Sequence, residues 1–178
     1  MTRAPSAADL DAVSAQLGRP ARDVLAIAAR TTDGAPAVVA TAPRLADGTP
    51  FPTFYYLTHP ALVAAVSRLE ADGVMRPWSE LVAEGGPLAE AYAAAHRAYL
   101  ADRAAAGDVP EVAGTSAGGM PVRVKCLHAL AGHALAAGPG VNPIGDLALS
   151  TAAEAEPEVA RLVGRWPAPA PLPAPAGD

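Results

Sequence analysis

Residues 118–149, GGMPVRVKCLHALAGHALAAGPGVNPIGDLAL, contain most of the reactive side chains that this chain offers. They include its single cysteine, Cys126, and two of its four histidines, His128 and His133. The spacing of apolar residues predicts a helix over 121–137, because proline suits the first turn of a helix and Gly138 suits a C-terminal cap. We therefore expect a functional site in this helix or beside it.

The sequence before this helix predicts a small antiparallel sheet. Two apolar runs, 23–30 and 36–42, flank the hairpin-type turn Thr32-Asp33-Gly34. A third run, 51–58 (FPTFYYLT), contains both phenylalanines and two of the four tyrosines, a composition typical of a strand. Further helices are predicted at 6–17, 61–71, 87–106 and 153–163, with a short turn at 78–83 and a turn with a short segment at 143–149. The expected fold is α+β, with about three strands packed against four or five helices.

The domain organisation follows from length and composition. A chain of 178 residues predicts one domain, here over 1–165. The segment 166–178 alternates proline with alanine and is predicted to be disordered or polyproline II.

Charge and composition exclude several classes of function. The net charge of −5 argues against general nucleic-acid binding, which needs a basic surface. No apolar run approaches the roughly 18 residues of a membrane span, and the N-terminus lacks the apolar core of a signal peptide. One cysteine cannot form an internal disulfide, which fits a reducing compartment. We expect a cytoplasmic protein without a membrane partner.

A metal site is the first functional hypothesis. Cys126, His128 and His133 are soft ligands that suit zinc, with His59 as a ligand from elsewhere in the chain. On a regular helix Cys126 and His133 share one face, whereas His128 lies roughly 160° away. A regular helix therefore predicts that the three cannot all bind one ion.

An anion site is the alternative. Residues 114–125 form a glycine-rich segment in which Gly118 and Gly119 offer backbone N–H groups and Arg123 and Lys125 offer charge. This pattern indicates a metal-free module for a small phosphate-bearing ligand. It is not a Walker A loop, since methionine and proline replace the required Lys and Ser/Thr. A third, weaker hypothesis is a thiol-dependent hydrolase or transferase in which a histidine activates Cys126.

Three stretches together carry a family resemblance: APRLADGTPFPTFYYLTHP (42–60), SRLEADGVM (67–75) and VKCLHALAGHALAAGPGVNPIGD (124–146). They resemble the actinobacterial family of domain of unknown function 501, small cytosolic proteins without an established activity. The resemblance implies cysteines in the first hairpin turn and before the proline that follows YYLT. Here residues 31–34 contain no cysteine, and His59 precedes Pro60. Because histidine also binds metals, the resemblance implies a zinc site that combines His59 with Cys126 and His128.

Overall fold

The structure, a computed structural model, describes residues 4–164 and 166–167. Its elements, in chain order, are α1 (Ala7–Leu17), β1 (Val24–Arg30), β2 (Pro36–Thr41), β3 (Tyr55–Leu57), α2 (Pro60–Ala71), α3 (Met75–Ala83), α4 (Gly86–Ala106), the 3-10 helix η1 (Pro110–Val112), α5 (Leu127–Ala137), α6 (Pro143–Ala155) and α7 (Pro157–Val163). The α+β class and the three-stranded antiparallel sheet are confirmed. Among the described residues there are seven α-helices, more than the four or five predicted.

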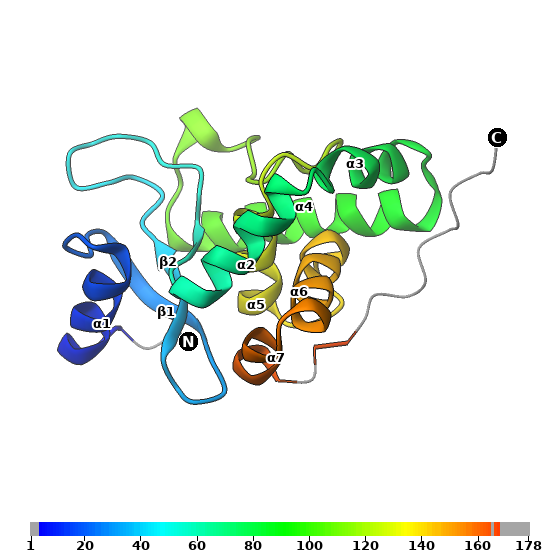
Figure 1. Ribbon diagram of the computed structural model, residues 1–178. Helices are drawn as coiled ribbons and strands as arrows, with labels where there is room; N and C mark the ends of the chain where they lie inside the picture. The colour runs from blue at the N-terminus through cyan, green and yellow to red at the C-terminus, as the bar shows by residue number, and fades with distance from the viewer. Residues whose placement is uncertain (1–3, 165, 168–178) are drawn as a thin grey trace.

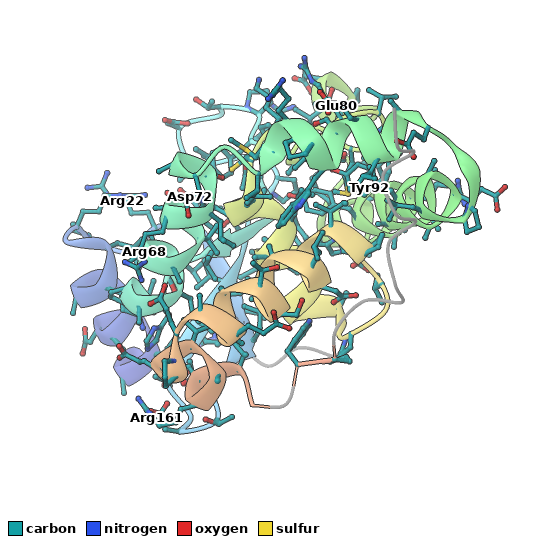
Figure 2. The ribbon with its side chains drawn as sticks, turned by 45° about the vertical axis from the view of Figure 1, so that its right-hand side comes forward. Arg22, Arg68, Asp72, Glu80, Tyr92 and Arg161 are labelled. Carbon is teal, nitrogen blue, oxygen red and sulfur yellow. The ribbon has the colours of Figure 1, made fainter. Side chains whose placement is uncertain are left out.

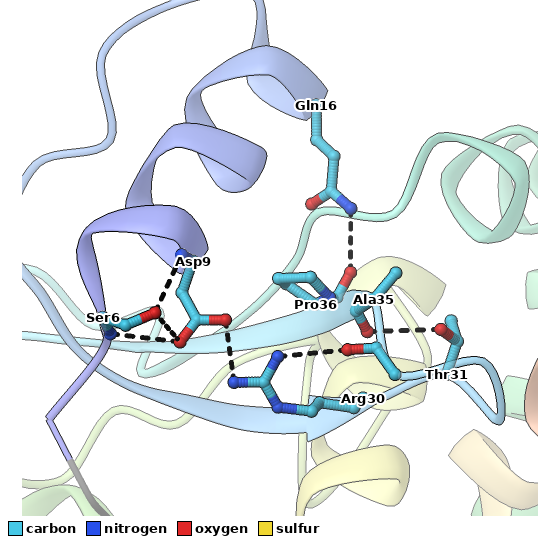
Figure 3. Close-up of polar contacts among 8 residues, drawn as sticks. Ser6, Asp9, Gln16, Arg30, Thr31, Ala35 and Pro36 are labelled. Carbon is cyan, nitrogen blue, oxygen red and sulfur yellow. Dashed lines mark hydrogen bonds and ion pairs between the residues drawn. The ribbon is translucent and has the colours of Figure 1, made fainter.

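The sheet has the order β1-β2-β3, and both pairs are antiparallel. Every residue of β2 is buried. This follows from its central position in the sheet, because α1 and α5 both contact β2 (Figure 1). The first turn of α1 has a capping box between Ser6 and Asp9, and Asp9 also pairs with Arg30 of β1 at 2.8 Å (Figure 3). These local contacts attach α1 to the sheet.

Helix α5 is the centre of the core and contacts the sheet, α2 and α6. Two glycines lie where it meets its neighbours, and only Gly145 requires the lack of a side chain. A Cβ on Gly132 would lie 3.4 Å from the carbonyl oxygen of Tyr55 in β3. A Cβ on Gly145 of α6 would lie 2.2 Å from the carbonyl oxygen of Leu130 in α5. The absence of a Cβ at Gly145 lets the backbone of α6 approach the first turn of α5 and fixes the position of that turn.

The predicted helix over 121–137 is wrong at its start, because α5 begins at Leu127. The preceding amides donate back into the glycine-rich segment instead of continuing a helix. The N–H groups of Lys125 and Cys126 donate to the carbonyl oxygen of Gly118, at 2.7 and 3.3 Å. A closed turn therefore precedes the helix, and Cys126 is its N-cap residue with an extended backbone.

The third strand is shorter than the predicted 51–58. Only Tyr55–Leu57 form β3, because side chains of α4 bind the backbone before it. The Tyr99 hydroxyl accepts from the Phe54 N–H at 2.5 Å, and the Arg103 guanidinium donates to the Pro52 carbonyl at 3.0 Å. Tertiary contacts thus replace strand pairing in this segment.

Three helix boundaries also differ from the prediction. The short turn expected at 78–83 is the nine-residue helix α3. The C-terminal part divides into α6 (Pro143–Ala155) and α7 (Pro157–Val163) instead of segments at 143–149 and 153–163. Asn142 caps α6 by accepting from the Gly145 N–H at 2.9 Å, and Pro157 occupies the first turn of α7. These caps move both boundaries.

No helix among the described residues is long and apolar enough to cross a membrane. The predicted disordered segment, 166–178, lies mostly outside the described residues. Of its two described residues, Trp166 donates from its indole to Asp146 at 3.0 Å.

Candidate metal and thiol centre

Three potential metal ligands meet where the end of α2 faces the start of α5. One ligand atom each from Glu70, Cys126 and His128 lies within 4.8 Å of the other two. All three side chains are partly buried. Among the residues that the structure describes, this is the one group of three or more Cys, His, Asp or Glu side chains with such spacing.

The late start of α5 makes this cluster possible. Cys126 has an extended backbone, with φ −147° and ψ 108°, so it does not share the helical geometry of His128. The predicted separation of roughly 160° therefore does not apply. The sulfur and the imidazole approach one another although their residues are two apart in sequence.

Glu70 and Ser67, both on α2, hold the imidazole of His128 from two sides. The Glu70 carboxylate oxygen Oε1 lies 3.1 Å from Nδ1, and the Ser67 hydroxyl lies 3.1 Å from Nε2. The same Oε1 accepts the Leu127 N–H at 2.6 Å, so the N-terminus of α5 already has an anionic partner. Arg68, in the last turn of α2, and Asp72, the C-cap residue of this helix, are labelled in Figure 2.

The electrostatics of the cluster favour a charged pair. The nearby Cys126 side chain, and secondly Glu70, raise the pKa of His128 to about 9 against the effect of burial. His128 in turn lowers the pKa of the Cys126 thiol, although burial and the Glu70 carboxylate oppose this. In the metal-free protein near neutral pH, the cluster therefore favours a protonated imidazole beside a sulfur with increased thiolate character.

A cavity of about 520 Å³ lies beside this cluster. Cys126 and His128 form one part of its lining, and Gln16 at the end of α1 forms another. The remaining lining includes Tyr55 and Tyr56 of β3. The reactive side chains are thus accessible from a partly open, largely apolar cavity.

His133 is not among the clustered ligands. It is fully buried in the core instead. Its ring stacks on Tyr55 with centroids 5.6 Å apart and meets the edge of Tyr99 at 5.2 Å. Its Nδ1 lies 3.1 Å from the side-chain nitrogen of Asn142. Burial lowers the pKa of His133 to about 4, so it is neutral at physiological pH.

His59 also lies outside the cluster. It is the N-cap residue of α2 and precedes Glu70 by eleven residues. Eleven residues of α-helix span about 16 Å, so the two ends of α2 are too far apart for His59 and Glu70 to bind one ion without rearrangement. The Nδ1 atom of His59 is buried and has no hydrogen-bond partner among the described residues.

The glycine-rich segment lines a second cavity, also of about 520 Å³. Its lining includes Gly118, Gly119, Arg123 and Lys125, together with His96. The N–H of Arg123 donates to the carbonyl of Gly119 at 3.1 Å, so this amide, like that of Lys125, serves the turn itself. A ligand here would therefore meet the side chains of Arg123 and Lys125 and not their backbone amides.

Glu70 and Ser67 were not among the residues predicted from sequence. Carboxylates such as Glu70 and Asp72 resemble those of a solvated helix face, and nothing in the spacing joins Glu70 to a histidine 58 residues later. The one available signal was their position in the 67–75 stretch that carried the family resemblance.

Comparison with known proteins agrees with that resemblance. The family described as "Protein of unknown function (DUF501)" matches residues 27–150, which include most of the sheet, α2 to α5 and all three members of the cluster. No curated protein matches the chain, and no solved structure does. Because the match covers more than half of the sequence, the chain belongs to the DUF501 family.

Proposed function

We propose that Glu70, Cys126 and His128 bind a divalent metal ion, with zinc as the best fit. The observation that carries the proposal is the convergence of one sulfur, one nitrogen and one oxygen ligand within 4.8 Å. Zinc accepts these three atom types at about 2.0–2.3 Å, so ligands around it lie roughly 3.5 Å apart. Small side-chain adjustments bring the present cluster to that spacing.

The surroundings of the cluster suit a metal ligand set. Ser67 can accept a hydrogen from Nε2 of His128, which leaves Nδ1 free to face the ion. The Leu127 N–H donates to the Glu70 carboxylate and so helps to fix its position. An ion at this point replaces the proton that His128 carries in the metal-free protein, and it offsets the charges of the thiolate and the carboxylate.

Three protein ligands leave the fourth position of a tetrahedral zinc open, as in catalytic rather than structural sites. Cys126 and His128 both line the apolar cavity beside the cluster, so this open position is expected to be reached from it. A bound zinc would supply Lewis-acid chemistry there, and Glu70, Cys126 and His128 would hold it.

The test is metal analysis of untagged protein purified without chelator and then reconstituted with Zn²⁺. We expect about one zinc per chain in the wild type and a large loss of affinity in Cys126→Ser, His128→Ala and Glu70→Gln. His59→Ala is the matched control, because it removes a histidine at the other end of the helix that carries Glu70.

The proposal fails if the reconstituted wild type holds no stoichiometric metal. Loss of zinc in His59→Ala would instead support the ligand set that includes His59, which the family resemblance implies. Retention of zinc in Glu70→Gln, with loss in the other two cluster variants, would restrict the site to Cys126 and His128.

The second candidate function is binding of a phosphate-bearing small molecule in the cavity of the glycine-rich segment. The observation in its favour is that Arg123 and Lys125 line this cavity without an Asp or Glu among its described lining residues. Titration with inorganic phosphate and pyrophosphate tests it. Binding that disappears in the Arg123→Gln/Lys125→Gln double variant supports the site, and unchanged binding in that variant excludes it.

A further inference from the structure

We propose that the cavity beside Glu70, Cys126 and His128 binds small molecules in which an oxygen-donor head is joined to an apolar body. The head occupies the open position of the metal ion, and the body lies against the apolar wall of the cavity. This inference rests on the metal centre proposed above and adds the class of ligand that the centre takes.

The lining of the cavity calls for two different parts in the ligand. Its volume of about 520 Å³ falls within the usual range of small-molecule sites. Among its described lining residues, Cys126 and His128 are the only Cys, His, Asp or Glu side chains, and most of the others are apolar or aromatic. An apolar body gains free energy by removing this wall from water, whereas the head has to replace water at the open position of the ion.

Helix α2 relates the two parts in space. Val63, Ser67 and Glu70 follow the spacing i, i+4 and i+7, so they lie on one face of this helix. Glu70 belongs to the cluster, and the Ser67 hydroxyl lies 3.1 Å from Nε2 of His128. Val63, at the other end of this row, lines the cavity. Seven residues of α-helix span about 10 Å, which leaves room between the cluster and Val63 for a body the length of one aromatic ring.

Two tyrosines of β3 give the wall its aromatic surface. The Tyr55 hydroxyl donates to Asp102 at 2.9 Å, so it already has a partner and does not compete with the ion for the head of the ligand. Tyr56 is one of three large apolar side chains that are exposed among the described residues, at 37%. A bound molecule that covers its ring removes apolar surface from water. Flat aromatic bodies and short aliphatic chains suit such a wall.

The experiment is a titration of the full chain, loaded with Co²⁺ in place of zinc, with two hydroxamates that share one metal-binding head. Benzohydroxamate carries an aromatic body, and acetohydroxamate carries only a methyl group. The visible absorption bands of cobalt change when a ligand binds the ion, so they measure binding of the head. We expect benzohydroxamate to bind at least about tenfold more tightly, because its ring is buried against the wall. Equal binding of the two hydroxamates would overturn the proposal.

Two matched variants locate the body of the ligand. Val63→Trp fills part of the cavity without removing a metal ligand, so it should keep its cobalt and lose most of the preference for benzohydroxamate. Val122→Trp makes the same substitution at a residue that is 72% exposed and does not line this cavity, so it should bind both hydroxamates as the wild type does. An undiminished preference in Val63→Trp contradicts the proposal.

A third variant covers the case in which Val63→Trp does not fold or does not retain cobalt. Tyr56→Ser removes a partly exposed ring from the wall. It should weaken the binding of benzohydroxamate severalfold and leave that of acetohydroxamate unchanged. Wild-type affinity for benzohydroxamate in this variant would contradict the placement of the body.

Metal uptake separates this inference from the function on which it rests. Uptake of zinc and cobalt, combined with equal binding of the two hydroxamates, refutes the ligand class and leaves the metal centre standing. Absence of uptake refutes the metal centre and the ligand class with it.

Discussion

Replacement of Gly145 by alanine tests the helix packing that supports the cluster. A Cβ at this position would lie 2.2 Å from the carbonyl oxygen of Leu130 and 2.7 Å from the Cβ of Ala134. Carbon–oxygen contacts are normally about 3.3 Å or longer, so α6 would have to move by roughly 1 Å from α5. The obstacle is a backbone oxygen within a helix, which cannot rotate away as a side chain can.

The expected change in stability is the sum of two opposing effects. Overpacking of a core costs about 1–3 kcal/mol, and the upper value applies because backbone has to move. The higher helix propensity of alanine returns at most about 1 kcal/mol. We expect Gly145→Ala to lower the free energy of unfolding by about 2 kcal/mol.

Gly132→Ala is the matched control, since it makes the same substitution in the adjacent helix α5. Its Cβ would lie 3.4 Å from the carbonyl oxygen of Tyr55, an ordinary contact. This variant should be as stable as the wild type or up to about 1 kcal/mol more stable. Urea unfolding followed by circular dichroism measures both, with a lower midpoint and an unchanged m value expected for Gly145→Ala.

The two variants should therefore change stability by clearly different amounts. If Gly145→Ala unfolds at the wild-type urea concentration, α5 and α6 do not pack as closely as the structure indicates. The inferred placement of the first turn of α5 would then lose its main support.

Three further predictions concern other buried polar groups. The pKa of His133 is about 4 in the folded protein, below its value of about 6.5 in an unfolded chain, so as pH falls the unfolded state takes up the proton first. The free energy of unfolding is therefore unaffected by His133 above about pH 6.5 and falls as pH is lowered towards 4, by about 2 kcal/mol at pH 5. His133→Phe should remove this part of the pH dependence. Equal changes of unfolding free energy with pH in both proteins would contradict the assignment. Arg103 is buried and donates to three backbone carbonyls. Arg103→Met should therefore lower the free energy of unfolding by about 2–4 kcal/mol in urea unfolding. A loss below about 1 kcal/mol would show that these hydrogen bonds contribute little. In metal-free protein, His128 lowers the pKa of the Cys126 thiol, so His128→Ala should slow alkylation of Cys126 by iodoacetamide near pH 7. The same alkylation rate in both proteins would contradict this and would also remove support for a thiol-dependent enzyme.

Local features of the chain were predictable from sequence because neighbouring residues determine them. The capping box of Ser6 and Asp9 involves residues three apart, and both of its bonds are present. The turn at 32–34 joins two apolar runs and closes the predicted hairpin. The α+β class follows from the same local periodicities, and the family resemblance from three conspicuous sequence stretches.

Boundaries that depend on distant contacts were predicted less well. The third strand is short because Tyr99 and Arg103, more than 40 residues later, bind the backbone around Pro52 and Phe54. Strand propensity does not contain this information, since it describes how a residue fits a sheet and not which side chains compete for its backbone. The composition of residues 51–58 favours a strand, but tertiary contacts limit the strand to Tyr55–Leu57.

The candidate site shows the same division. The sequence by itself identified Cys126 and His128 as potential ligands, because few other residue types have that chemistry. It could not identify Glu70 as their partner, or exclude His59 and His133 from the cluster. Those relations depend on where α5 begins and on which end of α2 it meets, and only the packing of α2, α5 and α6 determines both.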